Sequence, residues 1–451
     1  MTLPLRPVEQ PHAAHAAPVE PPYQWFLLGS LAIAIFGGIA FATAAVIAGV
    51  RELDWGARSA ALTQAHGQLQ LIGFGGLFII GMTLRILPRV SARPLRGGWL
   101  VWPTLLLVAG AMVLRALAQL DDSQNALRDA TLAGSAALFL LGAAAFTTLV
   151  LGTTLRRNAE ATEIFFTIGA VFLAASAVLN AAIAIEMVRD SRVLADAGKQ
   201  APLVFMEEYG FTLAFLAGVA TRALPPFSGR PRGERSSRAV AAGLALGVAL
   251  FAGAALAIEY GDRSETLARI AAAGLIVSAV SFAGIVWLTG VLHPRANRIA
   301  QASRTQFWFV RTAMAWLLAG SVLMAWYGLR AFADGRLPDQ FAIDALRHTF
   351  ALGVLTMMIL GMALLIVPEF AARRMHHAHD TPWIWAMLVA ANAAVVLRIW
   401  PSLEGVDWLE STRYSPMAWA GVLSEAVLIT FAFMFVQSWS ERSGWRRPPA
   451  S

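Results

Sequence analysis

The sequence predicts an all-α polytopic membrane protein with twelve transmembrane helices in three four-helix arcs. Three observations predict this fold class: the composition, the spacing of the apolar runs, and an internal repeat. Of the 451 residues, 57% are hydrophobic and only 14% are charged, whereas soluble domains carry roughly 25% charged residues. The mean hydropathy is +0.60. A soluble fold with so few charges could not shield this much apolar surface from water.

From Tyr23 onward, apolar runs of about 20 residues recur, which is the length that crosses the hydrocarbon layer of a bilayer. We expect a polar, disordered tail over 1–22, a transmembrane domain over 23–440 and a basic tail over 441–451. The twelve helices are expected near 23–50, 62–86, 98–119, 128–152, 162–187, 202–224, 238–258, 268–291, 307–330, 343–367, 382–400 and 416–438.

Charges in the loops predict the orientation of the chain. Arginines cluster after the second, sixth and eighth helices, whereas the loops on the other side are acidic or mixed. By the positive-inside rule, both termini are expected in the cytoplasm of a bacterium, with the protein in its inner membrane. The sequence contains no continuous basic tract, so a nucleic-acid partner is not expected. The absence of cysteine excludes disulfides, thiolate metal sites and iron–sulfur clusters.

The chain also repeats itself. Six residues ending the second helix match six ending the sixth at one offset (225 − 88 = 137), and a weaker match in the tenth helix follows 143 residues later. The pattern Gly–x₆–Pro is common where helices end, but six identical residues that all match at one offset favour a true repeat. We therefore expect three parallel units of four helices. The residues in register are Gly81, Arg85, Leu87, Pro88, Arg93 and Pro94; Gly218, Arg222, Leu224, Pro225, Arg230 and Pro231; and Gly361 and Pro368.

Two of the eight histidines, His66 and His348, fall inside the expected helices. His66 lies 22 residues before its repeat proline (88 − 66) and His348 lies 20 before its own (368 − 348), a difference of about 3 Å along a helix axis. Imidazole is a good ligand for iron and copper, and polar residues inside membranes are functional candidates. The sequence predicts metal or haem ligands at both positions; hydrogen-bonded packing histidines are the alternative.

Four more residues are candidates for the same site. Gln70 and Gly73 follow His66 by four and seven residues, so that they share its helix face and are expected to line a planar cofactor, unless the small residues only pack helices together. Glu207 and Glu208 fall at a related depth on the sixth helix. They are predicted metal ligands, with a proton relay or interfacial residues wetted from outside as alternatives.

These segments resemble the NnrS family, whose members are distantly similar to the main subunit of haem–copper oxidases. The resemblance rests on AHGQLQLIGFGGLFIIGM (Ala65 to Met82) and LRHTFALGVLTMMILGM (Leu346 to Met362). It implies a haem-copper-oxidase-like arrangement of helices, with His66 and His348 as ligands of haem b. However, the sixth helix reads PLVFMEEYG and the run 238–258 has no histidine. A binuclear haem–copper centre is therefore not expected, and nor is oxygen reduction.

What the resemblance implies is a membrane protein with haem, and copper as a second candidate metal, that acts in nitric oxide metabolism or nitrosative stress protection. Its expected partners are the lipid bilayer, haem, and nitric oxide or a metal–nitrosyl species. Whether it is an enzyme stays open. A twelve-helix secondary transporter is the alternative, although such transporters repeat as six-helix halves. A non-catalytic sensor or assembly subunit is a third possibility.

Overall fold

The computed structural model describes residues 22–53, 55, 57–121, 125–261, 264–293, 304–371, 381–403 and 414–440. Within these residues, twelve helices are long and apolar enough to cross a membrane, as the sequence predicts. The two expected tails lie outside the described residues, apart from Pro22. Each of the twelve helices is called a span below and is numbered in chain order.

The spans are built from these elements. The first four contain α1 (Tyr23–Ile33), η1 (Ala34–Ile39) and α2 (Ala40–Val50); α3 (Ala57–Gln68), η2 (Leu69–Gly76) and α4 (Leu77–Ser91); η3 (Gly98–Leu100) and α5 (Val101–Leu120); and α6 (Ala126–Thr154). The next four contain α7 (Ala161–Arg189); α8 (Ala197–Phe205), η4 (Met206–Thr212) and α9 (Leu213–Ala223), followed by η5 (Pro225–Ser228); α10 (Glu234–Tyr260); and α11 (Glu265–Thr289). The last four contain α12 (Arg304–Asp334); α13 (Gln340–His348), η7 (Thr349–Thr356) and α14 (Met357–Ala371); α15 (Thr381–Ile399) with η8 (Trp400–Ser402); and α16 (Tyr414–Ser440).

The observed helices agree with the expected ones to within a few residues. The largest differences are of five residues: the sixth span begins at Ala197 instead of residue 202, and the second runs over Ala57–Ser91 instead of 62–86. Arg58 and Ser59 lie in the first turn of the second span and lower its local hydropathy. The helix therefore extends beyond the apolar segment that a hydropathy window detects.

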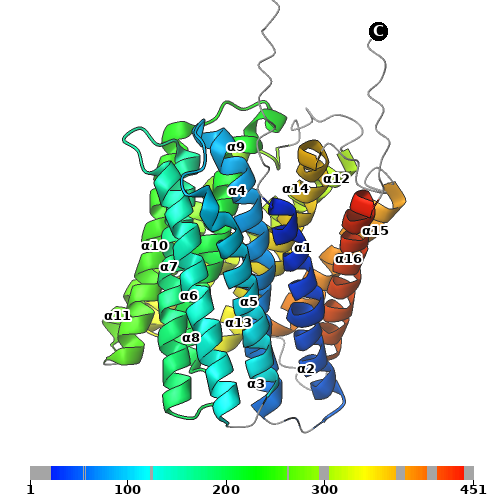
Figure 1. Ribbon diagram of the computed structural model, residues 1–451. Coiled ribbons are helices and arrows are strands. Elements are labelled where there is room, and N and C mark those ends of the chain that lie inside the picture. Colours follow the sequence, from blue (N-terminus) through cyan, green and yellow to red (C-terminus); the bar gives the residue numbers. More distant parts are fainter. Residues whose placement is uncertain are drawn as a thin grey trace, which may run out of the picture.

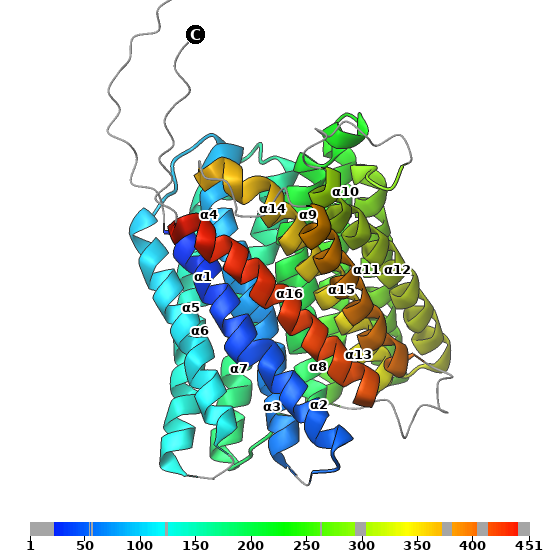
Figure 2. The same cartoon turned by 90° about the vertical axis from the view of Figure 1, so that its right-hand side faces the viewer.

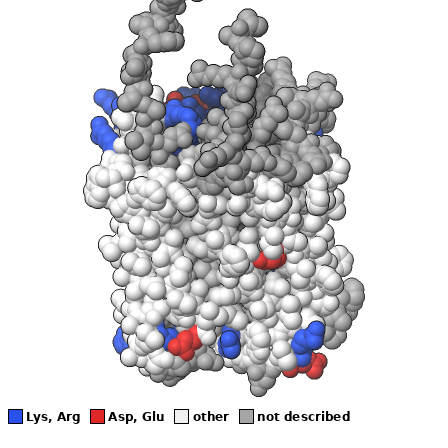
Figure 3. All heavy atoms as spheres, turned by 45° about the vertical axis from the view of Figure 1, so that its right-hand side comes forward, with Lys and Arg blue, Asp and Glu red and all other residues white. Residues whose placement is uncertain are grey.

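The spans stand side by side as one bundle (Figure 1). Helices that follow each other in the chain are packed as antiparallel neighbours, and α16 closes the bundle by packing against α2 (Figure 2). Tyr23 begins the first span and Ser440 ends the last span at the same end, called the terminal end below, and the opposite end is called the far end. On the face drawn in Figure 3, a broad band of side chains that are uncharged, apart from one acidic residue, separates the charged residues at the two ends, as a membrane protein requires.

The three-unit repeat is confirmed by how the first two spans of each unit cross. Gly81, Gly218 and Gly361 each face a phenylalanine on the preceding span, and a Cβ atom added there would lie 2.5 Å, 2.9 Å and 2.8 Å from the phenylalanine Cβ. Only glycine allows so close an approach of two helices. The phenylalanines are themselves repeat-equivalent (165 − 26 = 139 and 309 − 165 = 144): they are Phe26, Phe165 and Phe309.

A second glycine level, which the sequence analysis missed, lies two turns earlier. Gly73, Gly210 and Gly353 are spaced by the same two offsets (210 − 73 = 137 and 353 − 210 = 143). Each again lies against the first span of its unit, so every unit is closed by two glycine contacts. The facing residues are Ile33, Phe172 and Trp316.

The second span of each unit changes to a π-helix at the same depth. Each π-helical segment, η2, η4 or η7, begins 19 residues before the repeat proline (88 − 69, 225 − 206 and 368 − 349). The three segments contact one another, so the second, sixth and tenth spans meet on the central axis of the bundle. Because π-helical turns are rare and concentrate at functional sites, this level is the first place to look for chemistry.

Candidate functional site

His66 and His348 are neighbours at the far side of the π-helical level. His66 lies three residues before η2 begins and His348 ends α13, directly before η7. Their imidazole rings are nearly parallel, with 6° between the planes and 6.3 Å between the ring centres. The predicted match in depth therefore becomes a direct juxtaposition of two residues 282 positions apart (348 − 66).

Hydrogen bonds orient both rings in the same way. Nδ1 of His66 lies 2.8 Å from the carbonyl oxygen of Gly38, and Nδ1 of His348 lies 2.9 Å from that of Asp344. A carbonyl oxygen can only accept, so each Nδ1 carries the proton and donates it. In the neutral rings, Nε2 is then left with a free lone pair, which is the form of imidazole that binds metals.

The two rings differ in what supports them. The Asp344 carboxylate also lies 3.2 Å from Nδ1 of His348. That carboxylate is held by two 2.8 Å hydrogen bonds from the Arg398 guanidinium and one of 2.6 Å from Ser402. A carboxylate behind a histidine fixes the ring and makes it a stronger ligand. His66 has a neutral carbonyl in the same place, so His348 is the better supported of the two.

Glu207 and Glu208 are both fully buried, so the interfacial alternative is wrong for these residues. The Glu207 carboxylate accepts from the side-chain amide of Gln68, at 2.9 Å and 3.1 Å. Neither carboxylate oxygen of Glu208 makes a hydrogen bond of good geometry within the described part of the chain, but the backbone N–H of Ala351 and the positive charge of Arg347 act on this carboxylate. As adjacent residues the two point apart, and Glu207 thus faces the second span.

Gln70 lies near the backbone that holds His66, whereas Gly73 lies in a helix contact. The Gln70 side chain lies against Gly38, where an added Cβ would come within 2.6 Å of its oxygen. This buried oxygen has no hydrogen-bond partner among the described residues. Gly73 lies against Ile33 in the helix contact described above. Gln70 therefore borders the carbonyl that holds His66, and Gly73 sets how closely the first span approaches.

The donor set fits haem better than a metal site built from protein ligands alone. The 6.3 Å between ring centres leaves space between the two imidazoles, and a metal–imidazole bond takes about 2 Å of it on each side when Nε2 faces the metal. Among the described residues, no group of three or more His, Asp or Glu side chains could hold a metal ion. Two imidazoles from different spans would supply two ligands, which suits iron whose other ligands come from a porphyrin.

The sequence analysis did not identify several residues of this site. Asp344 precedes His348 by four residues, a spacing that places both on one helix face and could have revealed it. Gly38, Gln68 and Ser402 carried no comparable signal, because their partners are far away in the chain. The structure alone brings them to the histidines and to Glu207.

The comparisons with known proteins agree with this architecture. The family model described as NnrS protein matches residues 20–438, nearly the whole chain. A comparison with curated proteins found no match. The matched region contains all twelve spans and both histidines of the pair. The chain therefore belongs to the NnrS family.

Proposed function

We propose that this protein binds one b-type haem between His66 and His348 and acts in nitric oxide metabolism or protection from nitrosative stress. The observation that carries the proposal is the pair of parallel imidazoles, 6.3 Å apart, each with its Nδ1 proton already donated to a carbonyl. Because the chain has no cysteine, no thioether link to the haem can form. Membership of the NnrS family supports the link to nitric oxide.

In this proposal, two residues of the chain bind the haem and two others orient them. His66 and His348 provide Nε2 ligands from two spans that meet on the axis, while Gly38 and Asp344 fix the two tautomers. Haem iron, when bound, supplies redox chemistry and affinity for nitric oxide. His348 is held by the carboxylate of Asp344, whereas His66 has only a neutral carbonyl behind it. With a haem bound, His66 would be the more weakly supported of its two ligands.

Copper stays a prediction at Glu207 and Glu208. Glu208 has a buried carboxylate that makes no hydrogen bond of good geometry in the described chain, and a cation would stabilise such a group in addition to the charge of Arg347. Glu207 already accepts two hydrogen bonds from Gln68. Metal analysis of purified protein, with Glu208→Gln as the comparison, tests this part separately from haem.

The transporter alternative is less well supported by the architecture. Transporters of twelve helices are built from two six-helix halves, whereas the glycine contacts and π-helical segments of this chain recur at offsets of 137 and 143 residues. Those offsets correspond to four-helix units. The site on the axis of three such units resembles a cofactor site more than a translocation path.

The orientation belongs to the same proposal: bacterial inner membrane, with both termini in the cytoplasm. The arginine-rich loops that follow the second and sixth spans lie at the terminal end of the bundle. A periplasm-active reporter fused after Asp121 should be active, and one fused after Arg232 should be silent. The reverse activities would place the histidine pair on the cytoplasmic side and contradict the orientation.

Purification and optical spectroscopy test the haem. The wild-type protein should show a Soret band and the spectrum of a six-coordinate, low-spin haem b. His66→Ala and His348→Ala should each remove or convert that signal, while His293→Ala, which changes a histidine outside the spans, should leave it intact. If the purified protein contains no haem, or if neither substitution changes the haem spectrum, then the assignment of His66 and His348 as haem ligands is wrong and the transporter alternative is favoured.

A further inference from the structure

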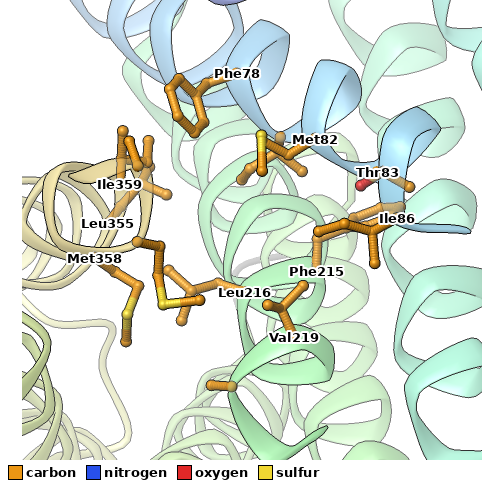
Figure 4. Close-up of a pocket in the computed structure, with 14 residues that line it drawn as sticks. Phe78, Met82, Thr83, Ile86, Phe215, Leu216, Val219, Leu355, Met358 and Ile359 are labelled. Atoms are coloured by element: carbon orange, nitrogen blue, oxygen red, sulfur yellow. The ribbon is translucent and has the colours of Figure 1, made fainter. Parts of the chain in front are cut away.

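A cavity lies on the central axis of the bundle, on the terminal side of the π-helical level. Its volume is about 70 Å³, and it is bordered by the second, sixth and tenth spans, which surround it in Figure 4. The lining residues come from α4, α9, η7 and α14. No residue of this cavity takes part in the histidine site.

The lining follows the threefold repeat. Phe78, Phe215 and Met358 occupy one repeat position (215 − 78 = 137 and 358 − 215 = 143), and all three border the cavity. Three further positions do the same in every unit: Ile79, Leu216 and Ile359; Met82, Val219 and Met362; and Thr83, Ala220 and Ala363. The cavity is thus the space that three equivalent helix faces leave between them, and the small residues at the last of these positions keep it open.

The chemistry of the lining restricts what can occupy the cavity. Thirteen of its fourteen residues are apolar, the exception being Thr83, whose hydroxyl is visible in Figure 4. An ion or a strongly polar molecule would lose its hydration there without hydrogen bonds in return. Apolar cavities of proteins stay dry and take up small apolar molecules such as xenon.

The size of the cavity restricts the occupant further. One water molecule needs roughly 10–15 Å³ of such space, so about 70 Å³ takes a few molecules of that size. Nine of the fourteen lining side chains are buried, among them Phe215, Met358 and Ala363, whereas the other five are partly exposed. The cavity therefore lies between the inner faces of three spans and is open on one side. Molecules of diatomic size fit, and a haem does not.

We propose that this cavity is a binding site for small uncharged gas molecules, nitric oxide among them, from which they reach the histidine pair. Along the tenth span, Leu355 at the cavity follows His348 by seven residues (355 − 348 = 7), which is at most about 10 Å, the rise of an α-helix of that length. Gases of this class dissolve in the hydrocarbon layer that surrounds the bundle. The gas-binding step stands on the cavity alone, whereas the delivery to haem rests on the proposed function.

Xenon binding tests the cavity without any need for haem. We expect xenon to be found on the axis when the purified protein is studied under xenon pressure by crystallography or ¹²⁹Xe NMR. Val219→Phe should abolish this signal because it fills the space from the sixth span, and the milder Val219→Leu should weaken it. Val280→Phe is the matched control, since Val280 is 67% exposed on α11 and faces away from the axis.

Each result decides the proposal. Xenon on the axis of wild type and Val280→Phe, but not of Val219→Phe, supports it; equal binding in all variants, no axial xenon, or a lipid chain held in the cavity overturns it. The double variant His66→Ala/His348→Ala separates this proposal from the haem proposal, because it should bind xenon like wild type. In haem-loaded protein, Val219→Phe should slow nitric oxide rebinding after photolysis, whereas Val280→Phe should not, and equal rates would overturn the delivery step.

Discussion

The two halves of the central axis are built from the same three spans and yet differ in chemistry. On the terminal side of the π-helical level, equivalent positions hold similar residues, as in Phe78, Phe215 and Met358 around the cavity. On the far side they diverge, because one repeat position holds Gln68, Phe205 and His348 (205 − 68 = 137 and 348 − 205 = 143). The comparison shows that symmetry preserves helix packing, while the polar residues of the candidate site arise where the units depart from it.

The largest effect is expected from the loss of either histidine in the divergent half, and it should appear as weaker haem binding. His66→Ala or His348→Ala removes an axial ligand, and we expect haem affinity to fall by more than the roughly 100-fold that loss of a supporting residue costs at most. Haem titration of the apoprotein measures this. Equal affinity in wild type and both variants would mean that the polar half does not bind haem through these rings.

Asp344→Asn should have the next largest effect. It replaces the carboxylate that Arg398 and Ser402 hold behind His348, and such substitutions weaken a metal site by roughly 10- to 100-fold. The reduction potential of the haem should also rise, because the ligand becomes less basic. Asp190→Asn is the control, since Asp190 lies outside the spans and pairs with Arg189. A potential unchanged by Asp344→Asn would contradict the asymmetry between the two histidines.

Substitutions in the symmetric half and at its glycine contacts should change the stability of the protein and leave the haem spectrum unchanged. An added Cβ at Gly210 would lie 2.6 Å from the Phe172 ring, so Gly210→Ala should destabilise the protein by about 1–3 kcal/mol through overpacking. Gly253→Ala is the matched control, because a Cβ there meets no atom within 4 Å. Thermal unfolding in detergent compares the two, and equal stability would show that the repeated glycines are not required for close packing.

The smallest change is expected for Glu207→Gln. The variant keeps one acceptor oxygen for Gln68, so the loss of the second hydrogen bond should cost about 1 kcal/mol. The haem spectrum should stay as in wild type, because this contact lies between the second and sixth spans and not at the histidine pair. An altered spectrum would instead support Glu207 as a metal ligand.

The fold was largely predictable because hydropathy and loop charge are local properties of the chain. Apolar length marked all twelve spans, and the offset of 137 residues marked the repeat. Hydropathy contains no signal for a π-helical turn, because one extra residue per turn leaves a fully apolar segment apolar. The aligned glycines at Gly73, Gly210 and Gly353 were visible in the sequence at the known offsets and were overlooked.

The candidate site was predictable only in part. His66 and His348 could be found because ionisable and metal-binding residues are rare inside spans. Of their supports, only Asp344 could have been found, from its four-residue spacing to His348. The others could not, since Gly38 lies 28 residues from His66 and Arg398 lies 54 from Asp344. Such pairs are created by the packing of helices, which a single sequence does not specify. Glu207 and Glu208 were found, but their burial depends on the neighbouring spans.

Electron paramagnetic resonance of the oxidised, purified protein tests the central claim most directly. That claim is that one haem is held between His66 and His348 by two imidazoles whose planes differ by 6°. Two nearly parallel axial imidazoles give a rhombic low-spin ferric signal, and we predict this signal for wild type and its loss in either alanine variant. A high-spin signal, the strongly anisotropic signal of crossed imidazole planes, or no haem signal at all would contradict the account.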